Sequence, residues 1–181
     1  MTSKPSPVDR EKTLAVKTWL QRYGEACAEL DHLSSRIDEL RAKVEGAGVS
    51  RLDGMPRGTS SPGDRLGLQV AILEDLEAEA GKMVEECKRL YQQIDQAIGR
   101  IKASRRRADM VAALRARYLD GFPWPEISGM LFGDHDDYED RRDSYLRRTH
   151  RLHGEALAEL AELLKNDDIM EGDKESELRT S

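Results

Sequence analysis

Aromatic side chains and long hydrophobic runs are scarce in this sequence. Its 181 residues include only two Phe, two Trp and five Tyr, and 35% are charged against 38% hydrophobic. That balance excludes a thick globular core and is typical of long amphipathic helices, which bury one stripe and leave the rest in water. No apolar run approaches the ~20 residues that span a bilayer, and the first residues do not resemble a signal peptide. We therefore expect a cytoplasmic protein without membrane contact.

Cysteine is also rare, and the motifs of enzymes are missing. Cys27 and Cys87 belong to no CxxC motif, and His150 and His153 have no third ligand at a recognisable spacing, so neither a metal nor a cofactor is expected. Both cysteines fall on apolar stripes and are interpreted as small buried hydrophobic residues; the alternative is a disulfide under oxidising conditions. Without a phosphate loop, GxSxG or HExxH motif, no enzymatic activity is expected.

Acidic residues are unevenly distributed. The formal net charge of −6 does not by itself favour a nucleic-acid partner. Residues 1–100 carry a net charge of −2, residues 101–153 a net charge of +2, and residues 154–181 a net charge of −6. The acidity is therefore concentrated at the C-terminal end, and the only basic stretch contains the motif described below.

Two heptad patterns predict a long antiparallel coiled-coil helical hairpin over residues 8–104. Hydrophobic residues recur every seven positions in two stripes beginning at Val16 and Trp19, and again in two stripes beginning at Leu66 and Leu76. Between them, residues 46–64 contain five glycines and two prolines and are predicted to form a loop. Residues 1–7, with two prolines, are predicted to be disordered.

The stripes do not account for every hydrophobic residue of the predicted hairpin. Leu20, Val84, Tyr91 and Ile98 flank the two seams. A pair of helices alone would leave these flanks partly open, so a further partner is expected. The candidates are the C-terminal helices and a second copy of the chain in a homodimer.

Residues 105–164 have the pattern of a helix-turn-helix module. A helix from Arg105 to Leu119 is predicted to end at Gly121, and a short helix over 122–131 to begin near Pro125. After a polar loop over 133–143, a final helix over 144–164 has Ser144 as its expected N-cap. The expected motif core consists of Leu114, Tyr118, Trp124, Ile127, Leu131 and Leu152. Residues 165–181 are predicted to be a disordered acidic tail.

The final predicted helix has a basic face suited to double-stranded DNA. With Thr149 and Leu152 on the packed side, the exposed side carries Arg147, Arg148, His150 and Arg151. Arginine forms bidentate hydrogen bonds to guanine or phosphate, and an α-helix fits the major groove. Further candidate phosphate contacts are Arg141 and Arg142 before this helix, and Arg105, Arg106 and Arg107 at the start of the third. Six phosphate contacts would give log affinity a slope of roughly −5 against log salt.

The segments LRARYLDG, WPEI and RLHGEAL carry a resemblance to a known family. Residues 114–157 resemble the fourth region of bacterial primary sigma factors, as adapted in phage-encoded late-gene regulators of the ArpU and RinA type. The hairpin extends the resemblance to roughly residues 14–160. The resemblance implies DNA-binding transcription regulation by a phage or prophage protein. It places Arg147, Arg148, His150 and Arg151 in the recognition-helix positions, Trp124 and Ile127 in packing positions, and Glu126 in the family's acidic position.

Two features depart from the family pattern. Residues 133–143 replace a short turn and contain six Asp or Glu side chains, which would repel DNA unless Arg141 and Arg142 neutralise part of their charge or the loop turns away. Thr149 occupies a position that is usually aliphatic. Two alternatives therefore stay open: an adaptor that binds RNA polymerase or another protein without touching DNA, and a DNA-packaging component similar to a small terminase subunit.

Overall fold

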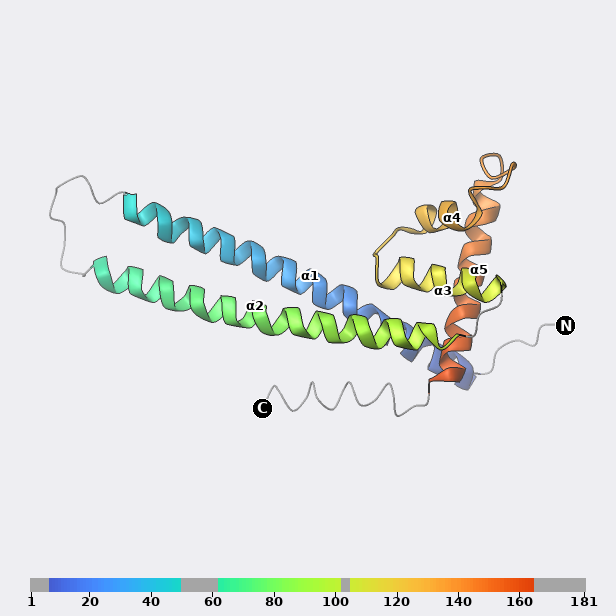
Figure 1. Cartoon of the computed structure of the whole chain (residues 1–181), viewed down its shortest axis with the longest axis horizontal. Helices are drawn as coiled ribbons and strands as arrows, with labels where there is room; N and C mark the ends of the chain where they lie inside the picture. Colours follow the sequence, from blue (N-terminus) through green and yellow to red (C-terminus); the bar gives the residue numbers. More distant parts are fainter. Residues whose placement is uncertain (1–6, 50–61, 102–104, 165–181) are drawn as a thin grey trace. The chain divides into compact units, whose positions relative to one another are not determined.

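The computed structural model describes residues 7–49, 62–101 and 105–164, and within these ranges the protein is all-helical, as predicted. The helices are α1 (Pro7–Val49), α2 (Pro62–Gly99), α3 (Arg105–Tyr118), α4 (Trp124–Phe132) and α5 (Arg142–Leu163) (Figure 1). None of the described helices combines the length and apolarity required to cross a membrane. The predicted disorder over residues 1–7 is wrong at Pro7, where α1 begins. Residues 1–6 and the predicted acidic tail fall outside the described residues.

Several predicted helix boundaries differ from the structure; for example, α2 ends at Gly99 and α4 spans Trp124–Phe132 in place of the predicted 122–131. The expected loop over 46–64 is too long at both ends, because α1 continues to Val49 and α2 begins at Pro62. A glycine inside a helix costs only about 1 kcal/mol, and a proline in the first helical turn costs nothing in hydrogen bonds. Ser144 is not an N-cap, since α5 begins at Arg142 after the cap residue Arg141. Residues 50–61 of the predicted loop lie outside the described ranges.

The chain forms two compact units. One unit is Glu25–Arg89, and the other combines Met1–Gly24 with Leu90–Ser181. The boundary between these units cuts through α1 and α2. The reason is a shared core, since the hydrophobic residues at the start of α1 and the end of α2 pack with those of α3 and α5.

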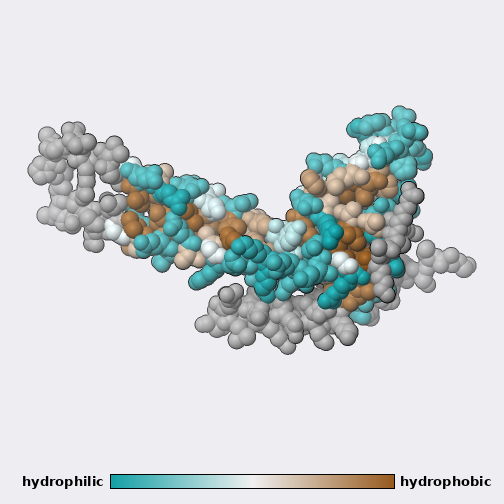
Figure 2. Space-filling view, viewed as in Figure 1, coloured by the Kyte–Doolittle hydropathy of each residue, from teal (hydrophilic) through white to brown (hydrophobic). Residues whose placement is uncertain are grey.

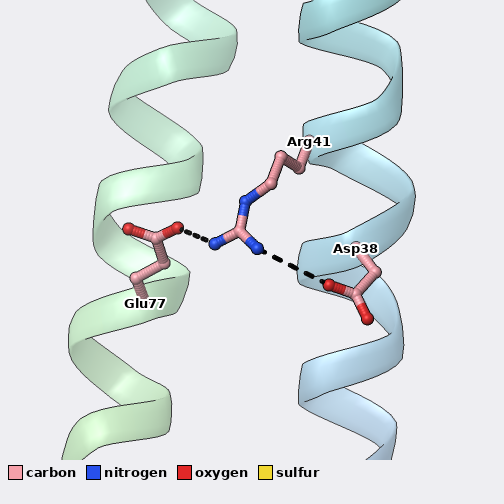
Figure 3. A network of polar contacts seen from close by, with 3 residues as sticks. All are labelled: Asp38, Arg41 and Glu77. Carbon is pink, nitrogen blue, oxygen red and sulfur yellow. Dashed lines mark hydrogen bonds and ion pairs between the residues drawn. The ribbon is translucent and has the colours of Figure 1, made fainter.

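In the unit Glu25–Arg89, α1 and α2 pack through their predicted stripes. Leu33, Ile37 and Leu76 form a buried cluster with Leu40, Leu73 and Ala80 around it. Figure 3 shows Arg41 of α1 between Asp38 of the same helix and Glu77 of α2, with Arg41 Nη2 2.6 Å from Glu77 Oε1. In Figure 2, apolar side chains gather between the two helices and polar ones cover the outward surface. This unit therefore has a narrow core that suits a helix pair.

Cys27 and Cys87 are neighbours across this helix pair, and both are free thiols. Burial, followed by the contact with Cys27, raises the pKa of Cys87 to about 11. A thiol with a raised pKa is a poor nucleophile because little thiolate forms near neutral pH. Cys87 is buried and Cys27 partly buried, which matches their interpretation as small hydrophobic residues.

The second unit contains the larger core of the described chain. Leu20 of α1 and Ile98 of α2 are fully buried in one cluster with Leu114 of α3 and Leu160 of α5. Helices α3, α4 and α5 also contact one another pairwise. For Leu20 and Ile98, the partner expected from the sequence is therefore the C-terminal helices. Tyr91 remains 43% exposed and meets Tyr23 edge to face, with ring centroids 5.6 Å apart.

The turn from α3 to α4 depends on Gly121. Its φ of +74° lies in the left-handed region, which costs other residues roughly 1–2 kcal/mol. The N–H of Phe122 donates to the carbonyl of Ala116 at 2.9 Å, which satisfies one carbonyl at the helix end. Pro123 then caps α4, and a proline in its first turn favours helix initiation, as predicted for Pro125.

Candidate nucleic-acid interface

The expected motif core is the scaffold on which α4 and α5 are held. Leu114 and Ile127 are essentially inaccessible, Tyr118 and Leu152 are buried, and Trp124 and Leu131 are partly buried against the same cluster. All six predicted core positions therefore contribute to one apolar cluster. Because the cluster fixes the rotation of α5 about its own axis, it also decides which α5 side chains face water.

Helix α5 has an inner and an outer face, as its sequence pattern predicts. Tyr145, Thr149 and Ala156 are buried, whereas Arg147, Arg148, His150 and Arg151 are exposed. Thr149, which stands where the family has an aliphatic residue, is completely buried. Its hydroxyl donates to the carbonyl of Tyr145 at 3.0 Å, so the polar group is satisfied within the helix. The departure at Thr149 therefore leaves the packing of α5 intact.

Three arginines of the outer face have no ion pair with a carboxylate among the described residues. Arg147 Nε donates to the carbonyl of Asp143 at 3.2 Å. The guanidinium carbon of Arg148 lies 4.6 Å from the centroid of the Phe132 ring, a cation–π contact that orients the group without neutralising it. Arg151 is exposed one turn beyond Arg147. The arginine charge on this face therefore remains available to an anionic ligand.

The acidic segment before α5 is held against the helix. The hydroxyl of Tyr145 donates to Asp137 Oδ1 at 2.6 Å, and the Tyr145 ring stacks with that of His135 at 5.3 Å between centroids. Tyr138 and Phe132 also meet the Tyr145 ring, at 5.4 Å each. The hydrogen bond from Tyr145, followed by that from Arg141, holds the pKa of Asp137 below its usual range. Aromatic packing thus keeps this segment next to the basic face.

Arg141 and Arg142 neutralise part of the acidic segment, which was one of the two possibilities that the sequence left open. Arg141 Nη1 lies 2.9 Å from Asp137 Oδ2, and Arg142 pairs with Glu139. Both pairs join residues three or four positions apart and are well exposed, so each contributes little to stability. Binding a phosphate at either position would require breaking such a pair. We therefore count neither as a principal DNA contact.

The structure also changes the interpretation of the arginines at the start of α3 as phosphate contacts. Arg107 Nε lies 2.8 Å from Glu159 Oε1, which ties the first turn of α3 to α5. Arg105 and Arg106 open α3, but the positions of their side chains lie outside the described residues. The predicted site over 105–107 thus has one arginine in a structural ion pair and two that the structure does not place.

A cluster around Trp124 lies beside the outer face of α5. The Trp124 ring is 4.7 Å from both His150 and His153, and the guanidinium carbon of Arg117 lies 5.0 Å from it. Arg117 Nη1 also donates to the carbonyl of Phe122 at 3.1 Å. Sequence reasoning did not select Arg117, because its contact with Trp124 depends on how α3 and α4 pack and leaves no local pattern.

His153 is a buried titratable group in this cluster. Its Nε2 lies 2.9 Å from the hydroxyl of Tyr118. Burial, with Lys17, His150 and Arg117 as nearby positive groups, lowers the pKa of His153 to about 4. Burial also raises the pKa of Tyr118 to about 12. At neutral pH both groups are therefore uncharged and share one hydrogen bond, so His153 serves packing.

Within the described part of the chain, no three His, Cys, Asp or Glu side chains gather where they could hold a metal ion. Comparisons of the chain with family models, with curated proteins and with solved structures found no match. The outer face of α5 is therefore interpreted from its own geometry and charge.

Proposed function

We propose that the protein is a DNA-binding transcriptional regulator of phage or prophage type, in which a helix-turn-helix formed by α4 and α5 binds duplex DNA through the outer face of α5. The observation that carries the proposal is the set of exposed arginines on one helical face, to which no carboxylate of the described ranges is paired. Arg147 and Arg151 lie one turn apart on that face and suit guanine edges or phosphates. The long α1–α2 pair would serve as the dimerisation or RNA-polymerase-binding arm.

Fewer arginines are available to contact DNA phosphates than the sequence alone indicated. Arg107, Arg141 and Arg142 are engaged in ion pairs, so the available cations of the described surface are Arg147, Arg148 and Arg151, with Arg117 beside them. Four phosphate contacts correspond to a slope of about −3.6 for log affinity against log salt, in place of the earlier −5. Because the acidic segment beside α5 repels phosphate, we expect no further contacts that would make the slope steeper.

Replacing Arg147 and Arg151 with Ala tests which side chains touch DNA. Each substitution is expected to weaken duplex binding by ~1–3 kcal/mol if the side chain contacts a base, and to relax sequence preference at that position. Binding is measured by gel-shift titration against fragments selected from phage or host DNA. Arg41→Ala, in the other unit and paired with Glu77, is the control and should bind as the wild type does. Unchanged affinity in both α5 variants would remove them from the interface.

One observation favours a second function, that of an adaptor that binds another protein without touching DNA. The acidic segment over 133–143 is held next to the basic face by Tyr145, where its charge would repel DNA. Phe122 and Met130, in the turn and on α4, are 37% and 61% exposed and so are accessible to a partner protein. The acidic segment over 133–143 would also suit a basic protein surface. An adaptor predicts complex formation that depends on Met130 and does not respond steeply to salt, which separates it from DNA binding.

A packaging component, similar to a small terminase subunit, would instead form a ring-sized oligomer in light scattering.

A further inference from the structure

The two ends of α4 each hold an arginine from another helix. At its first residue, the Trp124 ring carries the guanidinium of Arg117 from α3 at 5.0 Å. At its last residue, the Phe132 ring carries the guanidinium of Arg148 from α5 at 4.6 Å. A flexible arginine that is stacked on a ring loses less conformational freedom when it binds an anion. Both groups are thus prepared for binding before any ligand arrives.

The separation of these two positions follows from the helix between them. Trp124 and Phe132 are the first and last residues of α4, and eight residues of α-helix span ~12 Å along the axis. The major groove of B-DNA is also about 12 Å wide between its phosphate edges. The two ends of α4, where the rings that hold the guanidinium groups lie, are therefore separated along the helix axis by about the width of this groove.

The remaining arginines of α5 lie between these two groups. The Trp124 ring meets His150 at 4.7 Å, and Phe132 meets Arg148. At about 3.6 residues per turn, Arg147 and Arg151 fall between His150 and Arg148 around the exposed side of α5. A duplex that received Arg147 and Arg151 in its groove would bring its phosphates toward the two ends of α4.

From this arrangement we infer that Arg117 and Arg148 are positioning residues that hold phosphates of opposite strands at the two edges of the groove. Arg147 and Arg151 are left to contact the bases. The inference rests on the proposed function and divides its site into two roles. Arg117 is an addition to the residues that the sequence selected. Arg148, which the sequence placed among the recognition-helix positions, is here assigned to a phosphate. Phosphate contacts fix the register of a protein on DNA and contribute affinity without sequence preference.

The test compares the salt dependence of binding in matched variants. Fluorescence anisotropy with a labelled mixed-sequence duplex gives log affinity against log salt between roughly 50 and 200 mM for the full chain. The Arg117→Gln and Arg148→Gln variants should each reduce the magnitude of the slope by about 0.9, and the double variant by about 1.8. Arg117→Lys and Arg148→Lys retain the charge and should restore most of the slope. None of these variants should alter which base pairs are preferred.

Arg115→Gln is the matched control. Arg115 lies two residues from Arg117 on α3, but its Nε donates to Asp95 Oδ1 at 2.7 Å, so its removal should leave the slope unchanged. Circular dichroism melting confirms that each variant is folded. A steep wild-type slope that persists in the double Gln variant would overturn the inference and leave the proposed function standing. A wild type without a steep slope would overturn both.

Discussion

Replacing Leu20 with Ala should lower the free energy of unfolding by about 2–5 kcal/mol, the range measured for emptying a fully buried leucine site. Leu20 is completely inaccessible and belongs to the cluster that includes Ile98, Leu114 and Leu160. The cavity would form where α1 meets the C-terminal helices, so the loss should also reach the packing of α5. Urea denaturation followed by circular dichroism measures the free energy.

Leu14→Ala is the control for this prediction. Leu14 lies on the same helix and undergoes the same change in composition, but it is 62% exposed. Substitutions at such exposed positions usually change stability by no more than about 0.5 kcal/mol. If Leu20→Ala and Leu14→Ala unfolded at the same urea concentration, that result would contradict the packing of Leu20 in a core shared by the start of α1 and the C-terminal helices.

Acidification should destabilise the protein through His153. Its folded-state pKa of about 4 lies below the ordinary value of 6.5, so the folded state binds the proton less well than the unfolded state. The stability from a neutral His153 is therefore fully present above pH 6.5 and is lost as the pH falls toward 4. The difference between these pKa values corresponds to about 3 kcal/mol. Urea denaturation at a series of pH values measures this loss.

The variant His153→Gln isolates the contribution of His153. Glutamine can keep a hydrogen bond to the hydroxyl of Tyr118 but has no proton to gain in this range. Its unfolding free energy should be lower than that of the wild type at pH 7 and should fall less between pH 6.5 and pH 4. His32→Gln, an exposed site on α1, should keep the wild-type dependence. An equally steep loss in the His153 variant would show that other groups control the acid response.

The helical architecture was predictable because the hydrophobic period is long and consistent. Heptad stripes through Leu33, Ile37 and Leu76 place those residues in the buried seam of α1 and α2. The inner face of α5 followed in the same way from Tyr145 and Thr149. Burial at these positions depends mainly on local periodicity, which is visible in a single sequence.

The partners of the charged residues were not predictable to the same degree. Arg141 and Arg142 pair with Asp137 and Glu139, which lie four and three positions earlier in the same turn, so these two pairs are local. Arg107, by contrast, meets Glu159 from a distant helix. Such a pair depends on tertiary packing, and the same packing gave Arg117 its place beside Trp124.

The predicted start of α5 was wrong for a related reason. The pattern around Ser144 suits an N-cap, but the backbone turn that leads to Arg141 already begins the helix. The boundary at 104/105 followed a change in sequence character, whereas the compact units follow the core that Leu20 and Ile98 share with α3 and α5. Local signals do not report which elements share a core.

The most direct test of the central claim is the affinity of the unmodified full chain for a labelled duplex as a function of salt. The outer face of α5, with the cations that flank it, predicts measurable binding whose logarithm falls against log salt. The slope is about −1.8 if only Arg117 and Arg148 neutralise phosphates, and about −3.6 if Arg147 and Arg151 do so as well. Binding that is absent at low salt, or that does not change between roughly 50 and 200 mM salt, would contradict the assignment of this face to DNA.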